Sequence, residues 1–193
     1  MSSPKPIEFF YDVSSPYTYL SSEVVEAECA KAGVPLVWRP FLLGGVFKGA
    51  GNVMPASVPA KATYMLADLH RWSSRYGVSF KFPSRFPLNT LNAMRVLTAA
   101  APERRPALTH LLMRAYWMDD RDVSDPAELI HLLGEEGPAL LARSQTPEVK
   151  DALRAATEEA LTRGAFGAPT FFVGDAVFWG NDRLDFAIEE ALR

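Results

Sequence analysis

The chain has 193 residues, of which 48% are hydrophobic and 22% charged, and its net charge is −3. This length suffices for one domain with a sizeable core, and the composition is that of a soluble globular protein. The acidic balance argues against nucleic-acid binding, and no apolar stretch reaches the 18 residues of a membrane-spanning helix, so we expect neither kind of partner.

The beginning of the chain and its cysteine content predict a cytoplasmic protein. The first ten residues, MSSPKPIEFF, lack the apolar region of a secretory leader. Cys29 is the only cysteine, which excludes an intramolecular disulfide, a CxxC centre and a cysteine-rich metal site. His70, His110 and His131 lie in helical patterns without metal-ligand spacing, so we predict no metal site.

The first third of the chain predicts a strand, a helix and a second strand. Residues 7–12, IEFFYD, form a short aromatic and β-branched run, and a helical pattern follows over residues 16–32. The sequence PLVWRPF at 35–41 predicts the next strand, and a right-handed crossover would make the two strands parallel. Residues 42–60 contain four glycines and two prolines, and we expect an irregular, functional loop there.

The rest of the chain predicts a block of helices followed by a hairpin. Over residues 60–164 the signals are almost all helical, and Asp125 is typical of a residue that caps a helix start. Residues 169–173 and 176–180 predict two strands joined by a tight turn. An amphipathic helix follows to the end of the chain.

The order β–α–β, then helices, then β–β–α predicts an α/β fold. Without the middle helices this is the order of thioredoxin. We therefore predict a thioredoxin-like core with a large all-helical insertion. The predicted parts are residues 1–59 and 147–193 for the core and residues 60–146 for the insertion.

Ala168-Pro169 lies directly before the third predicted strand. A proline often opens a strand, and a single X-Pro bond is usually trans. In thioredoxin-like proteins, however, the proline at this place is cis, and the backbone of the preceding residue binds a peptide-like thiol. The predicted fold therefore implies a cis bond at Pro169 and a ligand-binding backbone at Ala168.

Ser14 and Ser15 stand between the first strand and Pro16, where a dithiol oxidoreductase of this fold carries CxxC. Dithiol chemistry is thereby excluded, because Cys29 lies far along the helix. A hydroxyl at a helix N-terminus can still stabilise the thiolate of a bound thiol, with help from unpaired N–H groups and the helix dipole. Taken alone, the pattern favours a plain helix cap at Ser14 or Ser15.

Six stretches carry a resemblance to a known family: YDVSSPYTYL, FLLGGVFKGAGN, VPAKATYMLADLHRW, FPLNTLNAMR, GAPTFFV and FWGNDRLDF. Together they resemble the 2-hydroxychromene-2-carboxylate isomerases, which are similar to kappa-class glutathione transferases and DsbA-type oxidoreductases. The resemblance spans nearly the whole chain. It implies a thioredoxin-like fold, glutathione as cofactor and a homodimer. It also implies that Ser15 faces the glutathione sulfur, with Ser14 as the alternative donor.

The resemblance assigns further residues to the glutathione site. Asn52 and Lys61 match positions that reach the backbone and the glycyl carboxylate of glutathione, although Lys61 alone would be interpreted as a solvated lysine. Asn181 and Asp182 match residues that hold the γ-glutamyl end. An acidic residue at a helix start also serves as a plain cap, and the two roles are compatible.

The second substrate is assigned by the same resemblance. Lys48 and Asn89 lie in segments that the family uses near this substrate, and either side chain could orient a carboxylate or a phenol. The implied partner is a small aromatic compound. Core packing explains most of the aromatic side chains in the chain better than substrate contact does.

The reaction that the resemblance implies is a glutathione-dependent cis–trans isomerisation. It would interconvert 2-hydroxychromene-2-carboxylate and trans-o-hydroxybenzylidenepyruvate, a step of naphthalene-type catabolism, through transient addition of the thiolate. Two alternatives stay open. The first is a kappa-like glutathione transferase or peroxidase, and the second is a non-catalytic binding protein of the thioredoxin fold.

Overall fold

Four strands form one mixed sheet in the computed structural model, which describes residues 3–193. β1 runs parallel to β2 and antiparallel to β3, and β3 forms an antiparallel hairpin with β4. The segment that follows β1 therefore leaves from the middle of the sheet. In the sheet order β2-β1-β3-β4, the bounds are β1 Ile7–Tyr11, β2 Leu36–Pro40, β3 Thr170–Val173 and β4 Ala176–Trp179.

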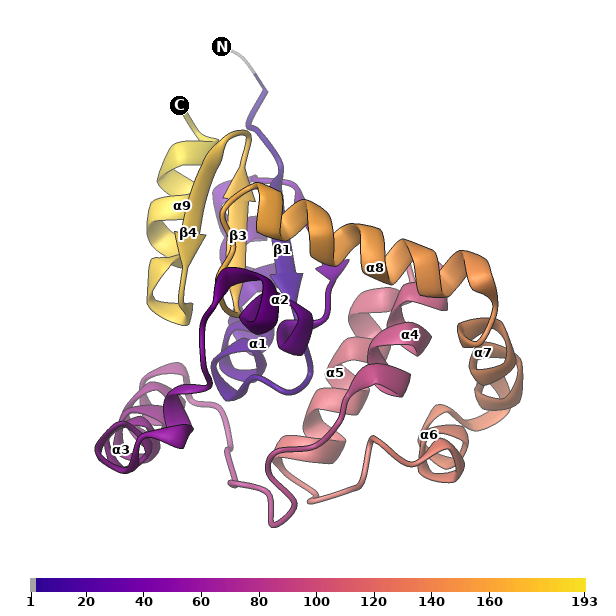
Figure 1. The fold of residues 1–193 in the computed structure, drawn as a ribbon. Coiled ribbons are helices and arrows are strands. Elements are labelled where there is room, and N and C mark those ends of the chain that lie inside the picture. The colour runs from indigo at the N-terminus through magenta and orange to yellow at the C-terminus, as the bar shows by residue number, and fades with distance from the viewer. Residues whose placement is uncertain (1–2) are drawn as a thin grey trace.

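Helices cover both faces of the sheet and extend to one side of it. Figure 1 shows α4, α5, α6 and α7 grouped beside the sheet, with α8 running back from them toward the strands. The α-helices are α1 Pro16–Ala32, α2 Leu43–Ala50, α3 Pro59–Tyr76, α4 Leu91–Ala99, α5 Arg105–Trp117, α6 Pro126–Leu133, α7 Gly137–Ser144, α8 Pro147–Thr162 and α9 Leu184–Ala191. Short 3-10 turns are η1 Pro55–Ser57, η2 Gly134–Glu136 and η3 Asn181–Arg183.

Successive residues of the strands are buried on opposite faces of the sheet. Phe9 and Phe171 face the main core, into which α1, α5 and α9 pack, and their rings stack at 5.2 Å. Phe10 and Phe172 face a smaller core formed with α2 and α8. Because both faces are covered, β1 is buried almost throughout, and the residues at its C-terminal end are fixed firmly.

Apart from α2, the element order predicted from the sequence is confirmed, and so is the α/β thioredoxin-like fold with many added helices. Asp125 caps α6 as predicted, because its carboxylate accepts a hydrogen bond from the N–H of Ala127. Among residues 3–193, no helix is long and apolar enough to cross a membrane. The division at 1–59, 60–146 and 147–193 stays a prediction.

The prediction of an irregular loop over residues 42–60 is wrong for its first half, where the chain forms α2. Three glycines lower the helix propensity of this segment, but two of them let it pack closely on α8. A Cβ atom at Gly45 would lie 3.0 Å from Thr157, and one at Gly49 would lie 2.5 Å from Leu161. These glycines therefore serve close helix packing, whereas the sequence pattern indicated turns.

Candidate active site

Helix α1 begins at the end of the central strand, and Ser15 is its N-cap. The backbone of Ser15 is extended, with φ −96° and ψ 120°, and its Oγ accepts a hydrogen bond from the N–H of Thr18 at 3.2 Å. Pro16 occupies the first helical position, where its missing N–H costs nothing. The predicted capping role is thus confirmed for Ser15, and the positive end of the α1 dipole lies at this residue.

The hydroxyl of Ser15 also reaches the segment before β3. Its Oγ donates a hydrogen bond to the carbonyl oxygen of Ala168 at 3.0 Å, and the side chain is only 4% exposed. The Ala168–Pro169 peptide bond is cis, and the carbonyl of Pro169 accepts a hydrogen bond from the N–H of Gly180. The structure therefore brings Ser15, Ala168 and Pro169 together from segments 153 residues apart.

Beside Ser15 and the Ala168-Pro169 segment lie η3 and the helices that contact it. Asn181 is 5% exposed, and its carbonyl accepts a hydrogen bond from the hydroxyl of Tyr76 at 3.0 Å. Asp182 is half-buried and forms an ion pair with Arg183 at 3.1 Å. A groove of about 800 Å³ runs from Asn181 and Asp182 along α1, α3 and α9. Both predicted residues thus lie at a groove that borders α1.

Tyr17 and Asp68 join the first turn of α1 to α3, and sequence reasoning missed both. The hydroxyl of Tyr17 donates to Oδ2 of Asp68 at 2.9 Å. Burial, followed by the contact with Asp68, raises the pKa of Tyr17, and Asp182 acts in the same direction. The phenol therefore remains protonated, and two carboxylates lie near the first turn of α1. The motif SSPY gave a signal for Tyr17, but no pattern pointed to Asp68.

Asn52 and Lys61 lie in the connection from α2 to α3 and in the first turn of α3. The side-chain amide of Asn52 donates to the carbonyl of Phe166 at 2.8 Å, and its Oδ1 accepts from the N–H of Val53. Asn52 therefore holds the segment that leads to Ala168. Lys61 is exposed to solvent. The roles predicted for both residues in ligand binding remain predictions.

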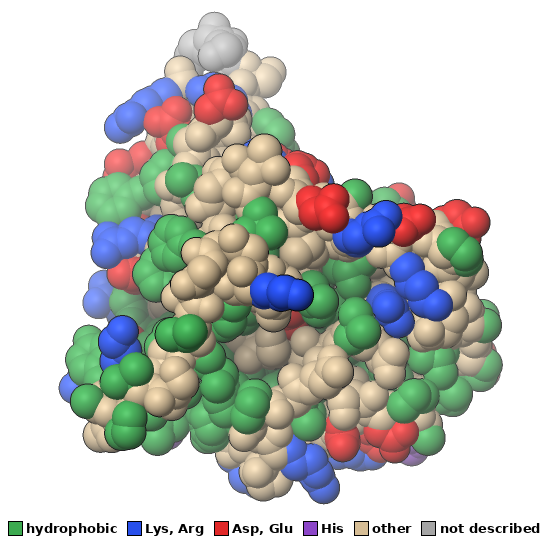
Figure 2. All heavy atoms as spheres, viewed as in Figure 1, with side chains coloured by type: hydrophobic (Ala, Val, Ile, Leu, Met, Phe, Trp, Pro, Cys, Tyr) green, Lys and Arg blue, Asp and Glu red, His purple; other side chains and the backbone are tan. Residues whose placement is uncertain are grey.

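Lys48 and Asn89 are exposed on two other segments, in α2 and directly before α4. Oδ1 of Asn89 accepts a hydrogen bond from the N–H of Leu91, which orders the start of α4. Figure 2 shows this face of the molecule hollowed beside α2, between α3 and the helices α4 and α5. The predicted contact of Lys48 and Asn89 with a second substrate remains a prediction.

Asp12 is a further residue that sequence reasoning did not assign to the site. It directly follows β1, its side chain is 1% exposed, and its backbone carbonyl accepts from the N–H of Ser15. Within residues 3–193, Asp12 is the one buried acidic residue. Burial raises its pKa, and hydrogen bonds to its carboxylate oppose that rise. An acidic residue between a buried strand and a serine turn was the available sequence signal.

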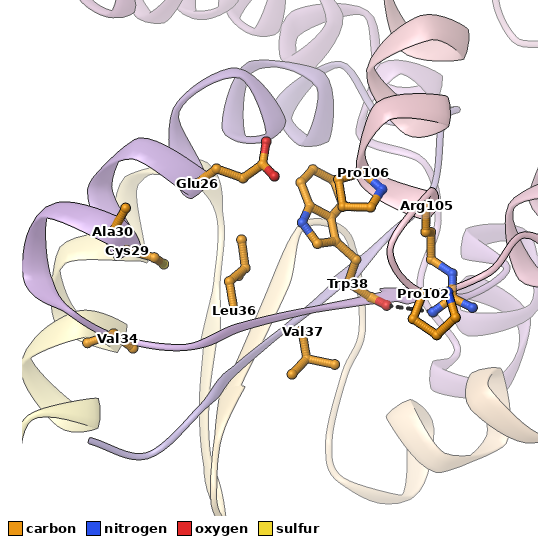
Figure 3. A pocket seen from close by; sticks show the side chains of 10 residues that line it. All are labelled: Glu26, Cys29, Ala30, Val34, Leu36, Val37, Trp38, Pro102, Arg105 and Pro106. Carbon is orange, nitrogen blue, oxygen red and sulfur yellow. Dashed lines mark hydrogen bonds between the residues drawn. The ribbon is translucent and has the colours of Figure 1, made fainter. Parts of the chain in front are cut away.

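A separate hollow lies at the opposite end of α1. It has a volume of about 470 Å³, and Figure 3 shows Cys29, Val34, Leu36 and Trp38 among the side chains that line it. The guanidinium of Arg105 donates to the carbonyl of Trp38 at 3.2 Å beside it. Burial raises the pKa of Cys29 to about 11, so its thiol is unreactive near neutral pH. This hollow contains none of the predicted site residues.

The sequence matches a family model described as the DsbA-like thioredoxin domain over residues 6–192. It is 33% identical to 2-hydroxychromene-2-carboxylate isomerase of Sphingobium xenophagum over 94% of this chain and 95% of that protein. The chain belongs to the DsbA-like thioredoxin family. Human glutathione S-transferase kappa 1 is also 33% identical to this DsbA-like chain, over 94% of the chain and 88% of the human protein.

Among solved structures, an isomerase is similar to this DsbA-like chain. A structure of 2-hydroxychromene-2-carboxylate isomerase matches it with a TM-score of 0.83 at 26% identity, over 96% of this chain and 93% of the other. These relatives are thus named as isomerases and as a glutathione transferase. This finding confirms the resemblance predicted from the six sequence motifs.

Proposed function

We propose that this protein binds glutathione, stabilises its thiolate and uses it to isomerise a small aromatic substrate. The observation that most supports this proposal is the hydrogen bond from Ser15 Oγ to Ala168 O at the N-terminus of a 17-residue helix. A hydroxyl donor and a peptide carbonyl are the two groups needed to receive the sulfur and the backbone of a cysteinyl residue. The two relatives named as isomerase and as glutathione transferase support the same proposal.

The side chains around Ser15 fit the chemistry of glutathione along its length. The cysteinyl N–H can pair with the carbonyl of Ala168 in place of Ser15 Oγ, which then donates to the sulfur. Asp182 offers a carboxylate for the γ-glutamyl ammonium, and Lys61 offers an ammonium for the glycyl carboxylate. In the proposed site, the γ-glutamyl ammonium and the glycyl carboxylate of glutathione would each meet a side chain of opposite charge.

The chain would lower the pKa of a bound thiol by two means. Ser15 Oγ–H can donate to a thiolate sulfur, and the first N–H groups of α1 add positive potential at the same place. A free thiol ionises near pH 8.5, and thiols at helix N-termini ionise at about 3.5–7.5. A substantial thiolate fraction at neutral pH follows, since each pKa unit changes the ratio of thiolate to thiol tenfold.

Bound glutathione would supply a thiolate that adds reversibly to the conjugated carbon of an enone, so that the former double bond rotates and re-forms trans. The residues of the chain orient the two reactants and hold the proton of Ser15 at the sulfur. Lys48 and Asn89 would hold the carboxylate and the phenol of the substrate. In this reaction glutathione is recovered unchanged, because the bond that forms to sulfur also breaks.

A kappa-like glutathione transferase or peroxidase is the second candidate, because human glutathione S-transferase kappa 1 has the same 33% identity as the isomerase of Sphingobium. The thiolate would be formed in the same way and would attack a different electrophile. Net consumption of glutathione identifies the transferase, and full recovery identifies the isomerase. A homodimer and a cytoplasmic location belong to the proposal in either case.

The decisive experiment is an ultraviolet titration of the thiolate of glutathione bound to wild type and to the variants Ser15→Ala and Ser14→Ala. We expect ionisation well below pH 8.5 in wild type and in Ser14→Ala, and a smaller shift in Ser15→Ala. A shift lost only in Ser14→Ala would move the donor role to Ser14. An unshifted thiol in wild type would contradict the proposed function and leave a non-catalytic binding protein.

A further inference from the structure

The carboxylate of Asp12 joins three parts of the chain. Its Oδ1 accepts hydrogen bonds from the N–H of Ser14 at 2.9 Å and from the hydroxyl of Thr90 at 2.7 Å. Its Oδ2 accepts from the N–H of Leu43 at 2.8 Å. Both oxygens are thus occupied, and the side chain is 1% exposed, so Asp12 itself cannot touch a substrate.

Each of these partners stands at the start of a helix. Ser14 directly precedes the N-cap of α1, Leu43 is the first residue of α2, and Thr90 is the N-cap of α4. The positive ends of three helix dipoles therefore converge on one carboxylate. Burying a carboxylate without hydrogen-bond donors costs free energy. Here the donors lie at helix starts, where backbone N–H groups have no acceptor within their own helix.

The same three helices carry the residues of both halves of the proposed site. Helix α1 presents Ser15 for the thiol, whereas α2 carries Lys48 and α4 is preceded by Asn89, the two residues predicted for the second substrate. The hollow seen in Figure 2 lies beside α2, between α3 and the helices α4 and α5. Their relative positions decide whether a thiolate and a conjugated carbon meet at the reacting distance.

We propose that Asp12 is the positioning residue of this site, which holds the thiol-binding start of α1 in register with the substrate-binding segments at α2 and α4. This inference rests on the proposed function. It differs from a general stabilising role, because it predicts that loosening one arm of the contact impairs the meeting of the two reactants and leaves thiol activation unchanged.

The Thr90 arm offers the cleanest test. Thr90→Val keeps the shape of a side chain that is 4% exposed and removes only the hydroxyl that donates to Asp12. Thr90→Ser restores that hydroxyl. Thr98→Val is a matched control on the same helix, because the hydroxyl of Thr98 donates to the carbonyl of Met94 and does not contact Asp12.

The experiment measures two quantities in wild type and in these three variants. The first is the pKa of bound glutathione by ultraviolet titration, and the second is kcat for turnover of trans-o-hydroxybenzylidenepyruvate. We expect Thr90→Val to keep the thiol pKa of wild type while kcat falls about 10-fold, since small misplacements of reactants are costly. Thr90→Ser should recover most of the rate, and Thr98→Val should resemble wild type.

Three outcomes would overturn the assignment of Asp12: an unchanged kcat in Thr90→Val, an equal loss of kcat in Thr98→Val, or a thiol shift that disappears together with kcat. Failure of the proposed function itself is recognised separately, in wild type alone. There, an unshifted thiol, or a shifted thiol without any turnover of the enone, would contradict the isomerase proposal before any variant is compared.

Discussion

The two ends of α1 offer a direct comparison between a hydroxyl and a thiol. Ser15 occupies the N-terminus, where the helix dipole favours negative charge, and its Oγ contacts a peptide carbonyl. Cys29 lies near the C-terminus, where the dipole disfavours negative charge and apolar side chains surround the sulfur. The one thiol of the chain is thus at the end of the helix where a thiolate is least stable.

Position along α1 therefore decides how well an anion is stabilised at each of these two residues. Burial raises the pKa of Cys29 to about 11, with Glu28 acting in the same direction. A dithiol oxidoreductase would place its nucleophile at position 15. This chain instead places a donor there, and a donor can stabilise a thiolate that belongs to another molecule.

The largest effect is expected at the N-terminal end. Ser15→Ala should reduce turnover of trans-o-hydroxybenzylidenepyruvate by about 10²–10³-fold, the usual loss when one donor to a developing anion is removed. Ser22→Ala is the matched control, because the hydroxyl of Ser22 on the same helix donates to the carbonyl of Tyr19. Steady-state kinetics check both variants. Near-normal turnover in Ser15→Ala would assign the stabilisation to the backbone N–H groups.

A thiol introduced at Ser15 allows the two ends of α1 to be measured with the same chemical group. In Ser15→Cys, we expect the introduced thiol to react with iodoacetamide at least about 100-fold faster than Cys29 at pH 7.5, because thiols at helix N-termini have lowered pKa values. The rates are measured by mass spectrometry of the labelled peptides. Equal rates would show that the N-terminus of α1 does not favour an anion.

A more moderate effect is expected beside the start of α1. Asp182→Asn should raise KM for glutathione about 10-fold and leave kcat nearly unchanged, because the lost charge pair concerns binding rather than the reacting atoms. Asp185→Asn provides a control of equal charge change, on the same groove in α9. An equal rise of KM in both variants would indicate a general effect of charge.

The smallest effect is expected in the middle of α1, where Glu23 contributes to the stability of the fold against acid. Burial opposes its charge, but hydrogen bonds from His110 and Arg114 lower its pKa to about 2, whereas an unfolded glutamate titrates near 4.3. A lowered pKa stabilises the fold above pH 4.3, and this stabilisation disappears as the pH falls toward 2. Glu23→Gln should therefore lose about 1 kcal/mol of unfolding free energy at pH 6 and little at pH 2.

Urea unfolding of wild type and Glu23→Gln at both pH values checks this expectation. Glu26→Gln is a suitable control, since Glu26 also contacts His110 but its side chain is 49% exposed. A loss that is the same at pH 6 and at pH 2 would mean that the charge of Glu23 is not the source of the stabilisation.

Much of the fold follows from local signals that the structure retains. Aromatic and β-branched residues account for β1, and a serine before a proline accounts for the capped start of α1. A glycine followed by an aspartate accounts for the tight turn between β3 and β4. Helix α2 could not be predicted in this way. Its glycines indicate a loop until α8 is known to pack against them.

The site was predictable only where one residue type has a characteristic neighbour. Ser15 is marked by the proline that follows it, and Pro169 by its place before the third strand. The structure brings the two residues together through Ala168. The contacts that Asp12 makes with Leu43 and Thr90 span 31 and 78 residues, and the contact of Asp68 with Tyr17 spans 51. Contacts of that kind depend on packing that sequence periodicity does not describe.

In the proposed thiol site, the hydrogen bond from Ser15 to Ala168 would favour some thiols over others. The hydroxyl has one proton, which it donates to the carbonyl oxygen of Ala168. A sulfur anion that accepts the hydrogen bond from Ser15 leaves that carbonyl without its donor, so the incoming molecule must provide an amide N–H in exchange. Simple thiols such as 2-mercaptoethanol lack that group, and an unpaired carbonyl costs about 1–3 kcal/mol. The exchange therefore favours thiols attached to a peptide backbone.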